Sequence, residues 1–176
     1  VLIADSIAKE GLEVFRQYKD IQVDVKTGLS PEELSKIIGE YDGLVVRSAT
    51  QFKGDVVNKA VKMKAVGRAG AGVDNIDVSL SSKKGIVVMN TPGGNSEAAA
   101  ELAVAMMTAL SRNIVAASIS MKSGKWEKSK FDKTSVEVAD KTLGVLGAGN
   151  IGSIVANRAI GLKMNVVVYD PYLPDE

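Results

Sequence analysis

A glycine-rich turn at residues 147–152 has the spacing G-x-G-x-x-G. It follows the apolar run 143–146 and precedes a predicted helix, so backbone N–H groups at the helix start could bind a phosphate. Asp170 ends the next apolar run, eighteen residues after Gly152. An acid that binds a ribose hydroxyl is expected about 20 residues after such a turn. This pattern predicts binding of a dinucleotide.

Each part of the turn has a mechanical role. Gly147 permits the tight turn, Gly149 lets a pyrophosphate approach the backbone, and Gly152 lets helix and strand pack closely. Asp170 would accept hydrogen bonds from the adenine ribose and repel a 2′-phosphate, which favours NAD over NADP. The alternative is a structural turn followed by an incidental acid. The order of strand, turn, helix, strand and acid favours dinucleotide binding over this alternative.

Two arginines stand where predicted strands end. Arg47 and Arg68 each directly follow a short apolar run. The carboxyl ends of parallel strands form the edge at which such sheets bind ligands. A guanidinium group pairs bidentately with carboxylate or phosphate, so the pair suits a small anion. Two neutral side chains at strand ends could add hydrogen bonds, namely Ser48 and Asn90.

Other interpretations of this region stay open. Each arginine could instead pair with a nearby acid, such as Asp42 or Asp74. A second glycine cluster at residues 67–72 lacks the third glycine at the dinucleotide spacing. It is therefore predicted as a loop at the carboxyl end of a strand, where it could approach a ligand.

The elements that must position these residues alternate over the first 90 residues. Strands are predicted at 1–5, 21–25, 43–46, 64–66 and 86–89, and helices at 8–18, 31–39, 56–61 and 75–84. The first helix should turn Leu12 and Phe15 inward, and Val14 is a further candidate for the inward face. The clearest helix start is at residues 30–33, where Ser30 caps and Glu33 completes a capping box. This alternation predicts a parallel sheet covered on both faces.

The character of the chain changes after residues 91–94, Thr-Pro-Gly-Gly. A long helix rich in alanine and methionine is predicted from Ser96 to about Lys122, with a bend near Arg112-Asn113. Its apolar residues cover more than one stripe, which predicts burial between domains or against another subunit. The sequence leaves both possibilities open. A loop is predicted over 123–140, followed by a strand, a helix and a strand over 142–146, 151–162 and 166–169.

Composition narrows the class of protein. Of 176 residues, 45% are hydrophobic and 24% charged, with a net charge of +1. These values predict a packed core and argue against nucleic acid as a main partner. No apolar run approaches the roughly 20 residues of a membrane span, and no signal peptide opens the chain. There is no cysteine. We therefore expect a cytoplasmic protein without a metal site.

Several segments, taken together, resemble the D-isomer-specific 2-hydroxyacid dehydrogenases over essentially the whole chain. They are residues 46–50, 66–75, 89–95, 100–102, 124–127 and 169–171. Within the family, the segments around Arg47 and Asn90 resemble members that oxidise a phosphorylated 2-hydroxy acid in the first step of serine biosynthesis. Other members of the family, of the glyoxylate or lactate type, are the first alternative. A non-catalytic NAD-sensing interaction module is the second.

The resemblance implies an α/β architecture. Residues 1–93 would form a flavodoxin-like parallel-sheet substrate domain. Residues 94–176 would hold the long interdomain helix and the first β-α-β part of a Rossmann NAD-binding domain. The helix at 96–122 would build a homodimer or homotetramer.

The resemblance also implies roles for single residues. Five would contact the carboxylate or phosphate of the substrate: Arg47, Ser48, Arg68, Gly70 and Asn90. Ala71 would lie near the nicotinamide, and Asn150 and Ile151 would meet the pyrophosphate.

The chemistry itself needs further groups. Hydride transfer from a hydroxy acid requires a base for the hydroxyl proton and a cation beside the forming carbonyl. The resemblance implies a histidine paired with a glutamate, plus an arginine, all located after the second strand of the NAD domain. The chain has no histidine, and only residues 171–176 follow Asp170. We therefore expect no catalytic residue here and a fragment of a longer enzyme.

Overall fold

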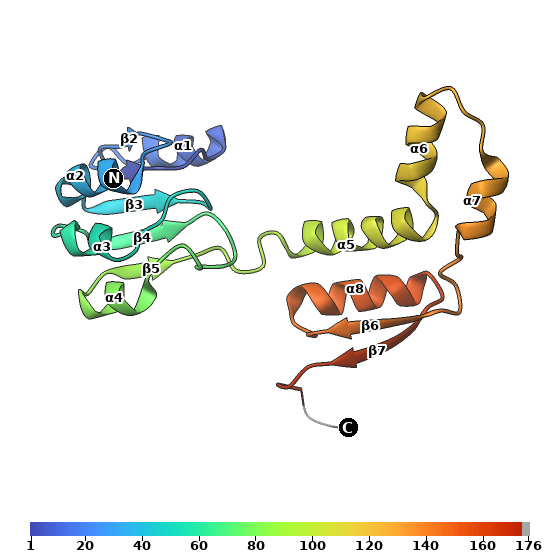
Figure 1. Cartoon of the computed structure of the whole chain (residues 1–176). Helices are drawn as coiled ribbons and strands as arrows, with labels where there is room; N and C mark the ends of the chain where they lie inside the picture. Colours follow the sequence, from blue (N-terminus) through green and yellow to red (C-terminus); the bar gives the residue numbers. More distant parts are fainter. Residues whose placement is uncertain (174–176) are drawn as a thin grey trace. The chain divides into compact units, whose positions relative to one another are not determined.

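The structure is a computed structural model that describes residues 1–173. The chain forms two compact units, Val1–Gly94 and Asn95–Glu176 (Figure 1). The last three residues of the predicted NAD-binding segment lie outside the described residues. Each unit is described in turn.

Unit 1 contains a five-stranded, fully parallel sheet with the order β2-β1-β3-β4-β5. The strands are β1 (Leu2–Ile3), β2 (Asp24–Val25), β3 (Gly43–Val46), β4 (Ala65–Arg68) and β5 (Val87–Met89). This is the flavodoxin-like order, which confirms the predicted architecture. The order reverses between β1 and β3, and ligands of such sheets bind beside the carboxyl ends of the strands at that point.

Short helices cover the sheet of unit 1. They are α1 (Lys9–Arg16), α2 (Pro31–Ile37), the 3-10 helix η1 (Ile38–Glu40), α3 (Asp55–Lys59) and α4 (Val78–Lys83). The predicted capping box at the start of α2 is confirmed. The Glu33 N–H donates to Ser30 Oγ at 3.3 Å, and the Ser30 N–H donates to Glu33 Oε2 at 2.8 Å. These reciprocal bonds satisfy two amide donors that the helix start would otherwise leave free.

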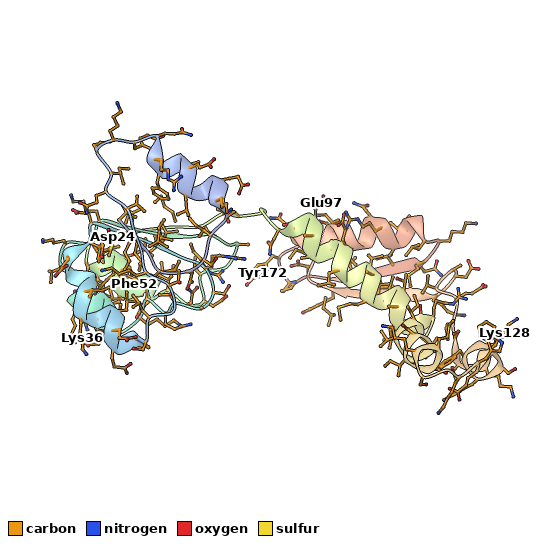
Figure 2. The ribbon with its side chains drawn as sticks, turned by 90° about the horizontal axis from the view of Figure 1, so that it is seen from above. Asp24, Lys36, Phe52, Glu97, Lys128 and Tyr172 are labelled. Carbon is orange, nitrogen blue, oxygen red and sulfur yellow. The ribbon has the colours of Figure 1, made fainter. Side chains whose placement is uncertain are left out.

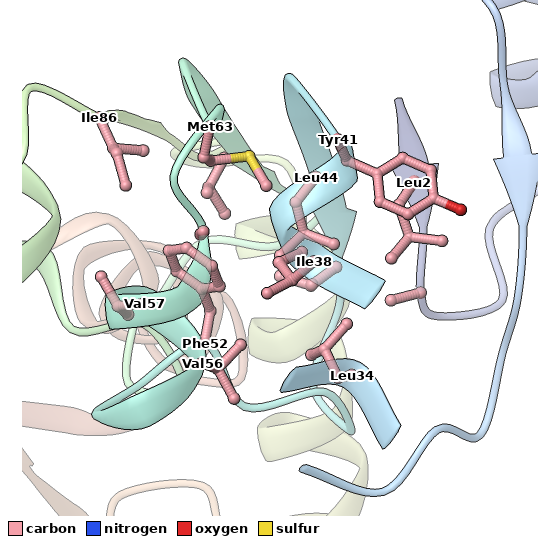
Figure 3. Packing of buried hydrophobic residues seen from close by; sticks show 14 of the residues in the cluster. Leu2, Leu34, Ile38, Tyr41, Leu44, Phe52, Val56, Val57, Met63 and Ile86 are labelled. Atoms are coloured by element: carbon pink, nitrogen blue, oxygen red, sulfur yellow. The ribbon is translucent and has the colours of Figure 1, made fainter. Parts of the chain in front are cut away.

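The core of unit 1 lies between the sheet and these helices (Figure 3). Its fully buried side chains include Leu2, Leu34, Ile38, Leu44, Phe52, Val57 and Val66. Full burial of each such side chain stabilises the fold by roughly 1.5–3 kcal/mol. Phe52 belongs to no strand, yet it forms a parallel bridge with Ile76 and is completely buried. It joins the loop after β3 to the loop after β4.

The first helix packs less closely than the sequence predicts. No residue of α1 is fully buried. Leu12 and Phe15 are half-buried, whereas Val14, a candidate for the inward face, is exposed. They line an apolar groove together with Ile21, Val23 and Val25. The physical reason is that β2 has only two residues, so this edge of the sheet offers little surface for α1 to cover.

Unit 2 contains α5 (Ser96–Ser111), α6 (Ile114–Lys122), α7 (Lys128–Thr134), β6 (Thr142–Leu146), α8 (Asn150–Gly161) and β7 (Asn165–Tyr169). Strands β6 and β7 are parallel, in a register that pairs Thr142 with Asn165 and Leu146 with Tyr169. Helix α8 connects them, and α5 packs against α8 (Figures 1 and 2). The predicted β-α-β part is therefore confirmed.

The predicted bend in the long helix is also confirmed. Asn113 adopts the left-handed conformation, with φ 54°, and separates α5 from α6. The two helix axes differ in direction by 63°. Within residues 1–173 no single helix is long and apolar enough to cross a membrane, although α5 and α6 together meet that test of length and composition.

Many apolar side chains of this helix pair are exposed on unit 2. They include Leu102, Met106, Leu110, Ile114, Val115 and Ile119, and Leu110 is 81% exposed. Packing inside unit 2 therefore leaves these apolar side chains of α5 and α6 unburied.

The loop predicted over 123–140 is wrong in its middle, because α7 occupies Lys128–Thr134. This segment has a single large apolar residue, Phe131, so it shows no helical periodicity. Contacts with α6 and its neighbours anchor it instead. Glu127 Oε2 accepts a hydrogen bond from Ser120 Oγ at 2.7 Å, and the Val136 N–H donates to the Ser111 carbonyl at 2.7 Å.

Candidate functional site

Arg47 and Arg68 lie at the carboxyl ends of the neighbouring strands β3 and β4. Arg68 is the register partner of Val46, so the two arginines are next to each other at one edge of the sheet. Arg68 Nε donates a hydrogen bond to the carbonyl oxygen of Arg47 at 3.0 Å. Arg47 is exposed and Arg68 is half-buried. This bond ties one arginine to the backbone of the other.

Neither arginine forms an ion pair with an acid in the described part of the chain. Asp42, one of the predicted alternative partners, instead pairs with Lys64 at 2.9 Å. Arg47 Nη1 reaches only the carbonyl oxygen of Ser6, at 3.4 Å. Asp74, the other alternative partner, lies near Arg68 without forming an ion pair: a Cβ atom added to Gly72 would be 2.9 Å from Asp74 Oδ2 and 3.0 Å from Arg68 Nη1. Within the described residues no ion pair therefore neutralises either guanidinium group.

A buried carboxylate lies behind this pair. Asp5 follows β1, is 6% exposed, and accepts hydrogen bonds from the Arg47 N–H at 2.6 Å and from Thr50 Oγ1 at 2.7 Å. The Thr50 N–H also donates to it, at 3.2 Å. Burial opposes ionisation, but the hydrogen bonds from Thr50 and Arg47 outweigh it and hold the pKa of Asp5 below its ordinary value.

Asn75 approaches the same turn from the loop after β4 and is 4% exposed. Its Nδ2 donates to the carbonyl oxygens of Arg47 at 2.9 Å and of Thr50 at 2.7 Å. Among the described residues its Oδ1 has no partner. Sequence reasoning missed Asp5 and Asn75 because it assigned one to a strand and the other to a helix. The available signal was an acid directly after a buried strand.

The loop at residues 69–72 lies against Arg68. A Cβ atom added to Gly70 would lie 3.4 Å from Arg68 Nη1, and one added to Gly72 would lie 3.0 Å from the same atom. Asn90 Nδ2 donates to the carbonyl oxygen of Ala71 at 2.6 Å. The structure thus gathers Arg68, Gly70, Ala71 and Asn90, while Ser48 is exposed in the turn after Arg47.

The glycine turn of unit 2 connects β6 to α8. Gly147 has φ +94°, a conformation that side chains disfavour, and its N–H donates to the Tyr169 carbonyl at 2.8 Å. A Cβ atom at Gly152 would collide with the carbonyl oxygen of Gly147 and lie 3.3 Å from Val145 Cγ1. Glycine is therefore required at both positions for the helix to start this close to the strand.

The first turn of α8 is open. Gly149 precedes the helix, and no side chain caps it. The Ser153 N–H donates to the Gly149 carbonyl at 3.0 Å. Within residues 1–173 it is the first N–H group of this helix that has an acceptor in the protein. A Cβ atom at Gly149 would meet nothing within 4 Å. The N–H groups of Asn150, Ile151 and Gly152 are thus free to bind an anion beside open space.

Asp170 follows β7 and bonds to the turn. Its Oδ1 accepts the Tyr172 N–H at 2.9 Å, and its Oδ2 accepts the Ala148 N–H at 2.7 Å. These backbone donors, Tyr172 first, hold the pKa of Asp170 below its ordinary value. The carboxylate is therefore ionised at neutral pH. In the described part of the chain, no group of three or more acids could hold a metal ion.

Comparison with known proteins places the chain. Residues 1–152 match the family described as D-isomer specific 2-hydroxyacid dehydrogenase, catalytic domain. A D-3-phosphoglycerate dehydrogenase from Archaeoglobus fulgidus is 45% identical over 100% of the chain, which covers 33% of that relative. Another from Synechocystis sp. is 48% identical over 100% of the chain and 31% of the relative. The chain spans about a third of the length of these curated relatives.

A solved structure agrees with these sequence matches. The NAD+-bound 3-phosphoglycerate dehydrogenase of Entamoeba histolytica has a TM-score of 0.75 and 31% identity, over 99% of this chain and 55% of that one. The fold, the full-length sequence similarity and the match over residues 1–152 lead to one assignment. The chain belongs to the D-isomer specific 2-hydroxyacid dehydrogenase family.

Proposed function

We propose that the protein oxidises D-3-phosphoglycerate to 3-phosphohydroxypyruvate with NAD. This chain would supply the substrate-binding unit and the first half of the NAD site. The main observation is that Arg47 and Arg68 are joined by a hydrogen bond at one sheet edge and form no ion pair within the described residues. Relatives with 45% and 48% identity over the whole chain are named D-3-phosphoglycerate dehydrogenase. A substrate with both a carboxylate and a phosphate suits two guanidinium groups.

The substrate contacts follow from this edge of the sheet. Arg47 and Arg68 would bind the two anionic groups, with Ser48 and the amide of Gly70 donating further hydrogen bonds. Asn90 holds the Ala71 carbonyl, so it would shape the loop as well as contact the substrate. Ala71 would face the nicotinamide.

The residues of the glycine turn fit NAD. Gly149 leaves open space where a pyrophosphate must approach, and the free amides of Asn150 and Ile151 would bind it. Asp170 would accept hydrogen bonds from the adenine ribose through its remaining lone pairs and repel a 2′-phosphate. When bound, the nicotinamide supplies the hydride acceptor. No histidine is present to take the hydroxyl proton, so this chain would bind and orient rather than transfer protons.

Assembly and location complete the proposal. The exposed apolar side chains of α5 and α6 would pack against a second copy of the chain, giving a homodimer or a homotetramer. The absence of cysteine suits a reducing compartment, and we propose the cytoplasm.

A calorimetric titration of this chain tests the proposal. We expect 3-phosphohydroxypyruvate and 3-phosphoglycerate to bind at least tenfold more tightly than unphosphorylated glycerate or lactate. Arg47→Gln and Arg68→Gln should abolish this preference. Lys64→Gln is the matched control, because this exposed cation precedes β4 at the opposite edge of the sheet. Equal affinity for lactate would favour another hydroxyacid dehydrogenase.

NADH titration separates the remaining alternatives. Because the chain spans about a third of its curated relatives, we expect weak NADH binding at best. Tight, stoichiometric NADH binding would contradict the proposal that this chain supplies only the first half of the NAD site. NAD-dependent dimerisation of the full-length protein without turnover would instead favour an NAD-sensing interaction module.

A further inference from the structure

The peptide groups on both sides of Arg47 are held by side chains. Its N–H donates to Asp5 Oδ2 at 2.6 Å. Its carbonyl oxygen accepts hydrogen bonds from Arg68 Nε at 3.0 Å and from Asn75 Nδ2 at 2.9 Å. Each of these two backbone groups therefore has a side-chain partner from a loop distant in the sequence.

We propose that Asp5 and Asn75 are positioning residues that hold Arg47 and Arg68 as one rigid anion-binding pair. This inference rests on the proposed function, in which those arginines bind the substrate. Asp5 and Asn75 are almost fully buried, so neither would touch the substrate. They act through the backbone of Arg47, and through its carbonyl they fix the guanidinium of Arg68.

The geometry explains how one bond sets the spacing of two charges. The Arg47 carbonyl is the acceptor for Arg68 Nε, so a shift of that carbonyl moves the Arg68 guanidinium with it. Asn75 restrains the same carbonyl and that of Thr50, three residues later. Asp5 restrains the amides of both residues. Side-chain hydrogen bonds thus hold the backbone N–H and carbonyl groups of both Arg47 and Thr50, the two ends of this turn.

The bonds of Asp5 also keep its carboxylate away from the proposed ligand. Its oxygens accept hydrogen bonds from the Arg47 and Thr50 backbone amides and from the Thr50 hydroxyl, and none from a guanidinium group of the described residues. An acid that paired directly with a guanidinium would compete with the substrate.

Thr50 provides the matched control. Its hydroxyl donates to Asp5 Oδ1 at 2.7 Å, in a bond that does not involve Arg47. Thr50→Val therefore weakens the same buried network while leaving both restraints on Arg47 in place. A network that only stabilised the fold would make Thr50→Val equivalent to Asp5→Asn.

The experiment compares Asp5→Asn, Asn75→Ala and Thr50→Val in the 176-residue chain. Hydrogen exchange at Arg68 Nε, followed by NMR, reports the bond to Arg47, and calorimetry reports 3-phosphoglycerate affinity. We expect Asp5→Asn and Asn75→Ala each to speed exchange and to weaken binding at least tenfold. Thr50→Val should change the exchange rate and the affinity less than twofold, even where it lowers the thermal midpoint as much as the other two substitutions do. Asn75→Ala carries the test if Asp5→Asn fails to fold.

The exchange rates decide the inference independently of the ligand. If the wild-type chain fails to bind phosphoglycerate, the proposed function fails. Faster hydrogen exchange at Arg68 Nε in Asn75→Ala would by itself still support the positioning role. Exchange and affinity that follow thermal stability equally in all three variants would overturn it.

Discussion

Asp170 Oδ2 accepts a hydrogen bond from the Ala148 N–H at 2.7 Å. The acid proposed for ribose recognition therefore also holds the second residue of the glycine turn. On the proposed function, this contact would couple the selection of the cofactor to the shape of the backbone that would bind its phosphates.

Asp170→Ala should change the preference between cofactors. Removing the carboxylate removes the repulsion of a 2′-phosphate and the ribose hydrogen bonds, so the ratio of NADH to NADPH affinity should fall at least tenfold. Fluorescence titration of both cofactors measures the ratio. Asp132→Asn, which changes an acid of α7, should leave it unaltered. A ratio unaltered in the Asp170 variant would remove this residue from the cofactor site.

Two glycines of the same turn should respond differently to alanine. At Gly152 the added Cβ collides with the Gly147 carbonyl, so Gly152→Ala should destabilise unit 2 by about 1–3 kcal/mol. At Gly149 the added Cβ meets nothing within 4 Å. Gly149→Ala should keep stability within about 0.5 kcal/mol but weaken NADH binding, because the methyl group occupies the approach of the pyrophosphate. Urea unfolding and NADH titration separate the two effects.

Arg158 joins α8 to α5 and should contribute measurably to unit 2. Its guanidinium pairs with the Glu97 carboxylate, donates to the Glu97 carbonyl at 3.3 Å, and lies 3.5 Å from Glu101 Oε1. Arg158→Ala should cost about 1 kcal/mol in urea unfolding, and less at high salt. Glu101→Gln should cost less than half as much, since its contact is long. An equal loss in 1 M salt would show that packing rather than charge joins the helices.

The stability contributed by Asp5 should depend on pH. Its pKa in the folded chain lies below the ordinary value of 3.8, because hydrogen bonds from Thr50 and Arg47 outweigh burial. The stabilisation is therefore fully present above pH 3.8 and is lost as the pH falls through the folded pKa. At pH 7 the urea midpoint of the wild type should be higher than that of Asp5→Asn. The difference between the two midpoints should narrow below pH 3.8. A difference in urea midpoint that widens at acid pH would contradict the lowered pKa of Asp5.

A charge placed on α5 should disrupt self-association. Leu110 is 81% exposed on unit 2, so Leu110→Glu should shift sedimentation of the chain towards monomer if this surface meets a second copy. Val61→Glu is the control, because Val61 is 78% exposed on unit 1. Unchanged association in the Leu110 variant would exclude α5 as the subunit contact.

Local features of the chain could be predicted from the sequence. The capping box joins Ser30 to Glu33, three residues apart, and the requirement for glycine at position 152 follows from a turn only six residues long. Alternating apolar segments predicted the parallel sheet because burial on both faces leaves a clear pattern. Helix α7 was not predicted, because its apolar residues show no helical periodicity. Its position depends on contacts with residues of other helices, such as Ser120.

The sequence alone determined the family, the strands that carry the arginines and the turn that would bind a dinucleotide. Only the tertiary structure decided what holds those arginines. Asp5 reaches Arg47 across 42 residues and Asn75 reaches it across 28. No local pattern encodes such pairs, because they meet only when parallel strands bring separate loops to the same edge of the sheet. The folded backbone therefore determines which polar residues are buried, what they bond to and how the two charges are spaced.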